Sequence, residues 1–267
     1  MKNSTINVLF ISDIVGEPGL KVTQNVINDI KEQYSIDCSI ANGENASGGK
    51  GLNIKNVEFL FDIGINVITS GNHFWMKEKL LEKIDNYATV LRQANYHMEN
   101  VGHGSTIYDV KGKGKIAVLN LQGRVFMQSI DCPFKIGAQE IKKLKKITNC
   151  ILVDFHAEAT AEKAAFAYRF DGKVSAVIGT HTHVQTADET ILPEKTAFIT
   201  DAGMTGPVDS VIGLKKEVAI RRFIYQTPVR YVLAEGEAQF NAVVVSINSE
   251  SGEALDIKRI SITKSEY

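Results

Sequence analysis

The order of apolar and polar positions along the chain predicts strands that alternate with amphipathic helices. Short runs rich in Val, Ile, Leu and Phe are separated by longer segments in which apolar residues recur every three or four positions. The first run, INVLFIS (6–12), predicts a strand, and GLKVTQNVINDIKEQY (19–34), which follows Pro18, predicts the helix packed on it. This alternation is typical of a layered α/β fold.

The same criteria predict further elements along the rest of the chain. A second helix covers residues 55–64 and ends at Gly64. Residues 105–121 predict a hairpin, and residues 239–263 predict two antiparallel strands around a turn. The other predicted strands are residues 38–41, 66–70, 116–121, 150–155, 175–179 and 196–200. The sequence contains no repeat, low-complexity tract or linker, so we expect one domain over residues 1–267.

Composition and charge narrow the class of protein. The chain has 267 residues, of which 44% are hydrophobic and 23% charged, as expected of a globular protein with a sizeable core. Its 30 basic and 31 acidic residues leave a net charge of -1. The balance gives no bulk electrostatic argument for binding nucleic acid or a membrane surface.

The cysteines and the N-terminal segment indicate a cytoplasmic protein. Cys38, Cys132 and Cys150 are widely spaced and form no CxxC motif, so neither a disulfide framework nor a cysteine zinc site is indicated. The N-terminal apolar run is too short for a signal peptide, and no later segment approaches the length of a membrane span. We expect no membrane partner.

Polar side chains of the kinds that bind metals follow five of the predicted strands. In an α/β sheet, ligands bind outside the carboxyl ends of the strands, where loops from distant parts of the sequence meet. One such residue would be a helix cap or part of a turn, but five strand ends together predict a shared site. The residues are Asp13, Glu44 with Asn45, Asn72 with His73, His156, and His181 with His183.

These residue types match the needs of two divalent ions. A carboxylate can bridge two cations, imidazoles suit Zn, Fe, Mn or Ni, and an amide oxygen fills a position without adding charge. Two ions about 3.5–4 Å apart can clamp the attacking and leaving oxygens of a phosphoryl centre. Taken singly, three of the residues could have purely structural roles: Asp13 as a helix cap, Asn45 as a brace of the glycine-rich loop, and His156 as a core histidine.

Three motifs resemble the calcineurin-like metallophosphoesterases: GNH (71–73) after a strand, a later single His after a strand, and GTHTH (179–183). Two positions depart from the usual pattern, with Val15 in place of a histidine and Glu44 in place of the bridging Asp. With NLQGRVFM, DFHAEATAEK and TDAGMTGPVDSVIG, these departures resemble the bacterial family related to 2′,3′-cyclic-nucleotide 2′-phosphodiesterases. The resemblance extends over nearly the whole chain and implies a four-layer α/β/β/α sandwich.

The resemblance also implies a ligand set for two metal ions. Glu44 bridges the ions, and Asn45 compensates for the missing histidine at Val15. In related enzymes the metal is usually iron, with manganese or zinc able to substitute. The first ion is assigned to Asp13, Glu44, Asn45 and His183, and the second to Glu44, Asn72, His156 and His181.

The implied activity is hydrolysis of 2′,3′-cyclic nucleotides. A metal-held hydroxide attacks phosphorus, and His73, next to Asn72, protonates the leaving ribose oxygen as general acid. A competing interpretation gives His73 only the role of orienting a ligand. We further expect Asp201 to orient a ligand histidine, and Arg124 either to contact phosphate or to brace its loop.

Several alternative functions stay open at this point. The site could serve a phosphatase or nuclease with another phosphoester substrate, or it could stabilise a regulatory RNA-associated metal-binding protein. A metal-dependent amidohydrolase also uses a His-x-His pair, but the pair is then expected on an early strand of a barrel, whereas here it stands at 181–183. RNA ends and a second copy of the chain also stay open as partners.

Overall fold

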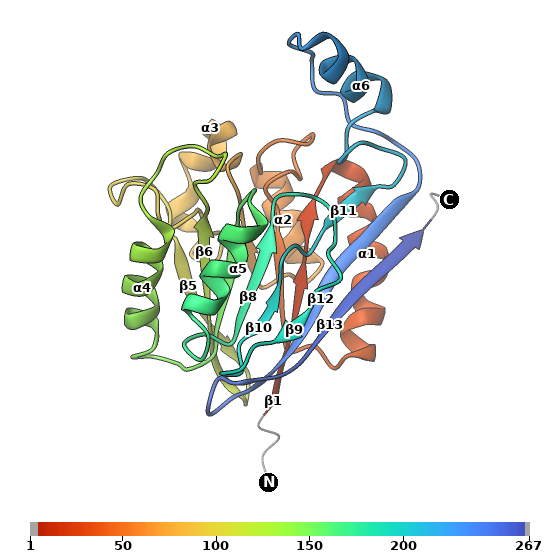
Figure 1. Ribbon diagram of the computed structural model, residues 1–267. Helices are drawn as coiled ribbons and strands as arrows, with labels where there is room; N and C mark the ends of the chain where they lie inside the picture. The colour runs from red at the N-terminus through yellow and green to blue at the C-terminus, as the bar shows by residue number, and fades with distance from the viewer. Residues whose placement is uncertain (1–4, 265–267) are drawn as a thin grey trace.

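The computed structural model describes residues 5–264, which form two β-sheets between two layers of helices (Figure 1). The first sheet has the strand order β2 (Asp13–Ile14), β11 (Met204–Pro207), β12 (Ala238–Asn248), β1 (Thr5–Ile11), β3 (Cys38–Asn42) and β4 (Val67–Thr69), and β13 (Ala254–Lys264) pairs with β12. The second sheet has the order β5 (Ser105–Val110), β6 (Gly114–Gln122), β7 (Ile151–His156), β8 (Ala176–Thr180), β10 (Ala197–Ile199) and β9 (Thr190–Ile191).

The helices divide between the outer faces of the two sheets. Helices α1 (Gly16–Gln33) and α2 (Ile54–Asp62) pack on the first sheet, and α4 (Pro133–Leu144) and α5 (Thr160–Arg169) pack on the second. A short helix, α3 (Glu78–Leu81), and two 3-10 turns, Phe74–Met76 and Ile84–Asn86, connect β4 to the second sheet. Helix α6 (Lys216–Tyr225) stands away from both sheets (Figure 1).

The period-two alternation of strand side chains produces the four layers. In β1, Val8 and Phe10 belong to the apolar cluster between the sheets, whereas Leu9 and Ile11 belong to the cluster beneath α1. The second sheet repeats the arrangement, because Val118 faces the first sheet and Leu119 packs beneath α4 and α5. Strands buried on both faces therefore appear in the sequence as nearly continuous apolar runs.

The predicted strands and both hairpins are present, and most boundaries agree within two residues. Helix α1 begins at Gly16, earlier than predicted, because Pro18 lies in the first turn, where its missing N–H costs no hydrogen bond. The short parallel pair β2–β11 and helices α4 to α6 were not among the predicted elements. Within residues 5–264, no helix combines the length and the apolar character needed to cross a membrane.

The parallel strands bring the loops that follow them to one end of the molecule. Strands β1, β3 and β4 run parallel in the first sheet, and β6, β7 and β8 run parallel in the second. The arrowheads of β1 and β8 point toward the end at which α6 stands (Figure 1). The loops that follow these strands hold the candidate site.

The aromatic packing between the second sheet and α5 gives a test of the fold. Phe166 is fully buried, and the centre of its ring lies 4.4 Å from the centre of the Phe155 ring. We expect Phe166→Ala to lower the free energy of unfolding by about 3–5 kcal/mol, because it leaves a cavity in this layer. Tyr168→Ala, on the same helix but 64% exposed, should change it by about 0.5 kcal/mol or less. Urea denaturation measures both values, and equal losses would contradict the assigned packing.

Candidate metal centre

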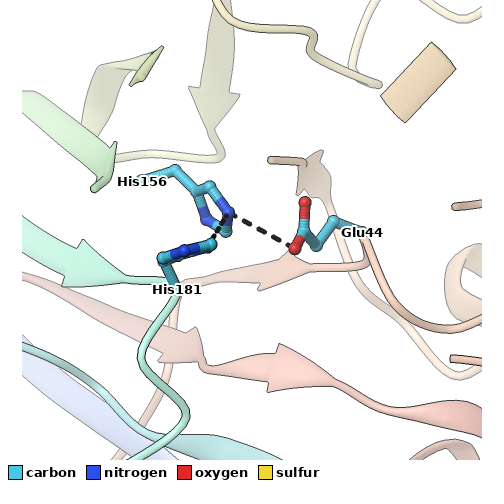
Figure 2. Close-up of side chains that lie close together, drawn as sticks. All are labelled: Glu44, His156 and His181. Atoms are coloured by element: carbon cyan, nitrogen blue, oxygen red, sulfur yellow. Dashed lines mark hydrogen bonds and ion pairs between the residues drawn. The ribbon is translucent and has the colours of Figure 1, made fainter. Parts of the chain in front are cut away.

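Each predicted metal ligand lies at the carboxyl end of a strand. Asp13 begins β2 just after β1, and Glu44 follows β3 by two residues. His156 is the last residue of β7 rather than the first residue after it, and His181 directly follows β8. Residues from both sheets therefore meet at one place, and Figure 2 shows Glu44, His156 and His181 turned toward one another.

Several electron-pair donors crowd around Nε2 of His156. This atom lies 3.0 Å from Nδ1 of His181 and 3.3 Å from Oε1 of Glu44 (Figure 2). It also lies 3.1 Å from Oδ1 of Asn72. None of these partner atoms needs to bear a proton, so their lone pairs repel unless a cation stands among them. We call these four residues the donor cluster.

A buried relay fixes which nitrogen of His156 faces the donor cluster. The hydroxyl of Thr180 donates its only proton to Oδ1 of Asp154 at 2.7 Å. The same hydroxyl oxygen lies 2.9 Å from Nδ1 of His156, so it can only accept a hydrogen bond from that nitrogen. In the neutral ring, Nε2 then has the free lone pair, which is the arrangement that a metal-binding histidine needs.

The charged groups of the site shift one another's pKa values. Burial alone would lower the pKa of His156, but the carboxylates of Glu44 and Asp13 raise it to about 9. Burial would raise the pKa of Glu44, but the charge and hydrogen bond of His156 hold it well below its ordinary value. Burial and the charge of His156 lower the pKa of His181 to about 3. Without a metal ion, a proton on His156 is thus the cation that the donor cluster requires.

Asp13 is a buried carboxylate with an unsatisfied oxygen. Its Oδ2 accepts a hydrogen bond from the backbone N–H of His181 at 3.0 Å, but its Oδ1 has no hydrogen-bond partner within residues 5–264. The helix-cap interpretation is wrong, because the N-cap of α1 is Val15 and no side chain caps this helix end. Burial raises the pKa of Asp13 well above its ordinary value, so a nearby cation is needed to keep it ionised.

Gly71 leaves open the space at the centre of the donor cluster. A Cβ atom at this position would overlap Oε2 of Glu44 and Nε2 of His156. The open space, the orphaned oxygen of Asp13 and the lone pairs around His156 together fit a divalent metal ion.

His73 and His183 are linked to the donor cluster through Asn45. Nδ1 of His73 donates to Oδ1 of Asn45 at 2.9 Å, and the backbone N–H of His73 donates to Oε2 of Glu44 at 3.1 Å. The amide nitrogen of Asn45 lies 3.1 Å from Oε1 of Glu44 and 3.2 Å from Nε2 of His183. Asn45 therefore contacts three other candidate residues and does more than brace the glycine-rich loop.

Asp201 acts on the backbone of the histidine loop, not on a histidine ring. Its Oδ2 accepts from the backbone N–H of Thr182 at 3.0 Å and from Nζ of Lys163 at 2.7 Å. Lys163 and Asp201 are both fully buried. His181 and His183 have φ angles of 104° and 66°, in the left-handed region that costs energy for residues with a side chain, so this loop needs the support of the buried ion pair.

Four residues of the site were not predicted from the sequence: Thr180, Asp154, Lys163 and Glu158. Glu158 lies 3.0 Å from Nε2 of His181, which leaves Nδ1 of that ring for the donor cluster. A polar Asp154 inside an apolar strand and a carboxylate two residues after His156 were usable signals.

Arg124 stands apart from the donor cluster. Its side chain is exposed, and its backbone N–H donates to Oε1 of Glu162 at 3.0 Å. The backbone N–H of Val125 donates to the same carboxylate at 3.2 Å. The loop is thus braced by Glu162 through backbone bonds that do not involve the Arg124 guanidinium.

The stacked sheets, with these donors at their shared edge, define a calcineurin-like metallophosphoesterase, as the sequence predicted. The family model described as YmdB-like protein matches residues 9–260, so the chain belongs to this family.

Similar proteins support the same class. The chain is 44% identical over 257 residues to a Bacillus subtilis (strain 168) protein named 2′,3′-cyclic-nucleotide 2′-phosphodiesterase, covering 96% of this chain and 97% of that one. It is 37% identical over 274 residues to a Mycoplasma pneumoniae protein named putative phosphatase/phosphodiesterase. The match covers 99% of this chain and 95% of that one.

Two crystal structures superpose closely. One is a novel phosphatase from Mycoplasma pneumoniae, with a TM-score of 0.93, 36% identity and coverage of 100% of this chain and 96% of that one. The other is a hypothetical protein from Thermus thermophilus, with a TM-score of 0.91 and 36% identity. The match covers 97% of this chain and 100% of that one. The predicted fold and the predicted enzyme class, a phosphoester hydrolase, are confirmed.

Gly71→Ala tests whether the space at the donor cluster holds a metal. We expect the variant to remain folded and to lose bound metal, because the added methyl group fills that space. Gly112→Ala, in the β5–β6 turn, is the control for metal content, since a Cβ there meets nothing within 4 Å and the turn lies at the opposite end of β6 from the site. Its φ of 77° is strained for alanine, so some loss of stability without loss of metal is expected there. Metal analysis by inductively coupled plasma mass spectrometry, with circular dichroism to check folding, measures both. Full metal content in Gly71→Ala would place the ion elsewhere.

The raised pKa of His156 predicts a pH dependence of metal binding. Below about pH 9 a metal ion must displace the proton from His156, so metal binding weakens as the pH falls. The apparent association constant for the metal should therefore rise about tenfold per pH unit up to about pH 9 and then level off. Calorimetric titration with Mn²⁺ at a series of pH values measures this slope. An association constant that is the same at pH 6 and pH 8, to within about twofold, would contradict the proton–metal competition.

Proposed function

We propose that the chain, as one catalytic domain, is a dinuclear metal-dependent phosphodiesterase that hydrolyses 2′,3′-cyclic nucleotides. The observation that supports it most is the convergence of Asn72, Glu44 and His181 on Nε2 of His156, around a space kept open by Gly71. The name of the Bacillus subtilis relative supports the choice of substrate, since the two chains match over nearly their whole lengths.

The ligands of the two ions come from both sheets. When bound, the ions would supply Lewis acidity toward the phosphoryl oxygens and lower the pKa of a water molecule. The mixed nitrogen and oxygen donors are compatible with iron, manganese or zinc, and iron is the metal that the family resemblance implies. We assign one ion to Glu44, Asn72, His156 and His181, and the other to Asp13, Glu44, Asn45 and His183.

The amide of Asn45 links metal binding to the proton on His73. One end of this amide lies near Glu44 and His183, and the other end lies near Nδ1 of His73. In the structure the amide oxygen faces His73, but a metal ligand would have to offer that oxygen at the first end. With a metal bound, the amide would therefore be turned over, and its nitrogen would donate to Nδ1 of His73. Nδ1 then accepts, so the neutral ring has its proton on Nε2, the atom from which a general acid would give it.

Hydrolysis of the cyclic phosphodiester requires one proton transfer to the leaving oxygen. A water oxygen forms a new bond to phosphorus and releases one proton to solvent, which later restores the proton of His73. The bond from phosphorus to the ribose 2′ oxygen breaks, and that oxygen takes a proton. His73 supplies it from Nε2, and the bond from its backbone N–H to Glu44 keeps the ring beside the ligands. The product is a 3′-nucleotide.

A phosphatase acting on monoesters is the second candidate. The same ligands can serve either ester, and the Mycoplasma pneumoniae relative is named for both activities. Hydrolysis rates of 2′,3′-cyclic AMP and of 3′-AMP, measured side by side, distinguish the two. The proposal predicts that 3′-AMP accumulates as the product, and release of inorganic phosphate from both at similar rates would favour the phosphatase.

The assigned roles of Glu44 and His73 predict two different defects. Glu44→Gln should lose both bound metal and activity, because it removes the bridging charge. His73→Ala should keep its metal but lower kcat for 2′,3′-cyclic AMP by about 10²- to 10⁴-fold, because it removes only the proton donor. Steady-state kinetics with parallel metal analysis measures both.

The control for these variants is His103→Ala, which removes an exposed histidine of the chain and should change neither quantity. A His73→Ala variant with the wild-type kcat would remove the general acid from the mechanism. Unchanged metal content in Glu44→Gln would contradict the bridging assignment.

A further inference from the structure

Helix α6 and the segments on either side of it form an arm, residues 208–236, that projects from the end of the molecule holding the metal centre (Figure 1). The base of the arm contacts the site. Nδ1 of His183 donates to the carbonyl oxygen of Ile212 at 3.0 Å. Within the arm, the backbone N–H of Ala234 donates to the carbonyl oxygen of Gly213 at 3.0 Å and so ties the two ends of the arm together at its base. The base of the arm therefore lies beside the proposed ligand His183.

A cleft of about 580 Å³ opens between the arm and the glycine-rich loop that follows Glu44 and Asn45. We call it the arm cleft, and its volume is that of a small-ligand site. It contains two cationic side chains and one aromatic ring but no carboxylate, and none of its residues is a proposed metal ligand. It is lined by Lys50, Arg222, Phe223, Gln226, Thr227, Pro228 and Val229.

The two cations of the arm cleft lack acidic partners. Lys50 and Arg222 take part in none of the ion pairs formed within residues 5–264, whereas the arm residues Lys215 and Lys216 pair with acidic neighbours. The Lys50 ammonium lies 5.0 Å from the ring centre of Tyr231. Two unpaired cations that share a cleft favour an anionic ligand.

The arm cleft adjoins the metal centre. The backbone N–H of Gly49 donates to the carbonyl oxygen of Asn45 at 3.1 Å, which places Lys50 next to this turn. Tyr231 packs against Gly49, where a Cβ would collide with its ring.

The chemistry of the substrate decides which anion the arm cleft can take. A nucleoside 2′,3′-cyclic phosphate has one phosphate, and that group must lie at the metal centre. A second phosphate is available only when the 5′ oxygen is esterified, as it is within an RNA chain. Aromatic rings such as Phe223 stack on the bases of single-stranded RNA.

We propose that the arm cleft binds the nucleotide on the 5′ side of the reacting one, so that the preferred substrate is an oligoribonucleotide ending in a 2′,3′-cyclic phosphate. Arg222 and Lys50 contact the linking phosphate, and Phe223 stacks on the preceding base. This inference rests on the proposed function. A contact of one nucleotide is compatible with the net charge of -1, which gives no support to an extended RNA-binding surface.

The test compares kcat/KM for adenosine 2′,3′-cyclic phosphate with that for the dinucleotide adenylyl-adenosine 2′,3′-cyclic phosphate. The wild type should prefer the dinucleotide by about tenfold or more, and Arg222→Ala should lower this preference about tenfold. Phe223→Ala should lower it by a similar factor through lost stacking. The matched control is Arg221→Ala, because Arg221 lies on the same helix but lines its other face, with Ile220 and Ile224.

The outcomes separate this inference from the proposed function. If the wild type hydrolyses both substrates with equal kcat/KM, the arm cleft proposal is overturned and the phosphodiesterase remains. A preference for the dinucleotide that survives in Arg222→Ala and Phe223→Ala also overturns it. If neither substrate is hydrolysed, the proposed function itself fails. Light scattering on each variant shows whether the oligomeric state is unchanged, so that a lost preference is not mistaken for lost assembly.

Discussion

The repulsion among lone pairs around Nε2 of His156 is the constraint on which the rest of the site depends. The Asp154–Thr180 relay fixes the tautomer of this ring, Gly71 leaves room for a cation, and acidic groups hold the positive charge there. Each of these features would destabilise the protein without a cation at the centre, since buried donors and carboxylates are costly when unpaired. The folded chain therefore maintains a place for positive charge, which a proton or a metal ion can fill.

The fold provides this convergence through two parallel strand sets that end at one edge. Glu44 and Asn72 come from the first sheet, and His156 and His181 from the second, so the stacking of the sheets determines the spacing of the donors. The buried Lys163–Asp201 pair is a second level of support, because it holds the strained loop between His181 and His183. The donor cluster is thus positioned by the core, whereas the arm cleft, which we propose to bind part of the substrate, is formed by the more exposed arm.

Much of this could be predicted from the sequence, because apolar runs mark buried strands and polar residues directly after them mark the site. The parts that could not be predicted depend on contacts between distant residues. Lysine is rarely buried, and no feature of the sequence around Lys163 indicates that it pairs with Asp201, thirty-eight positions away. Ile220 and Ile224 have the spacing of a core-facing helix, yet in α6 only Ala219 is buried. The space left by Gly71 exists only once two sheets have met.

The central proposal is that the donor cluster, together with Asp13, Asn45 and His183, would hold two metal ions that share Glu44 as a ligand. The most direct measurement is anomalous diffraction from crystals of the protein purified without chelator, collected at the absorption edges of iron, manganese and zinc. We expect two anomalous peaks on either side of the Glu44 carboxylate, one beside His156 and His181 and one beside Asp13 and His183. A single peak, or none at these residues in metal-supplemented crystals, would contradict the claim.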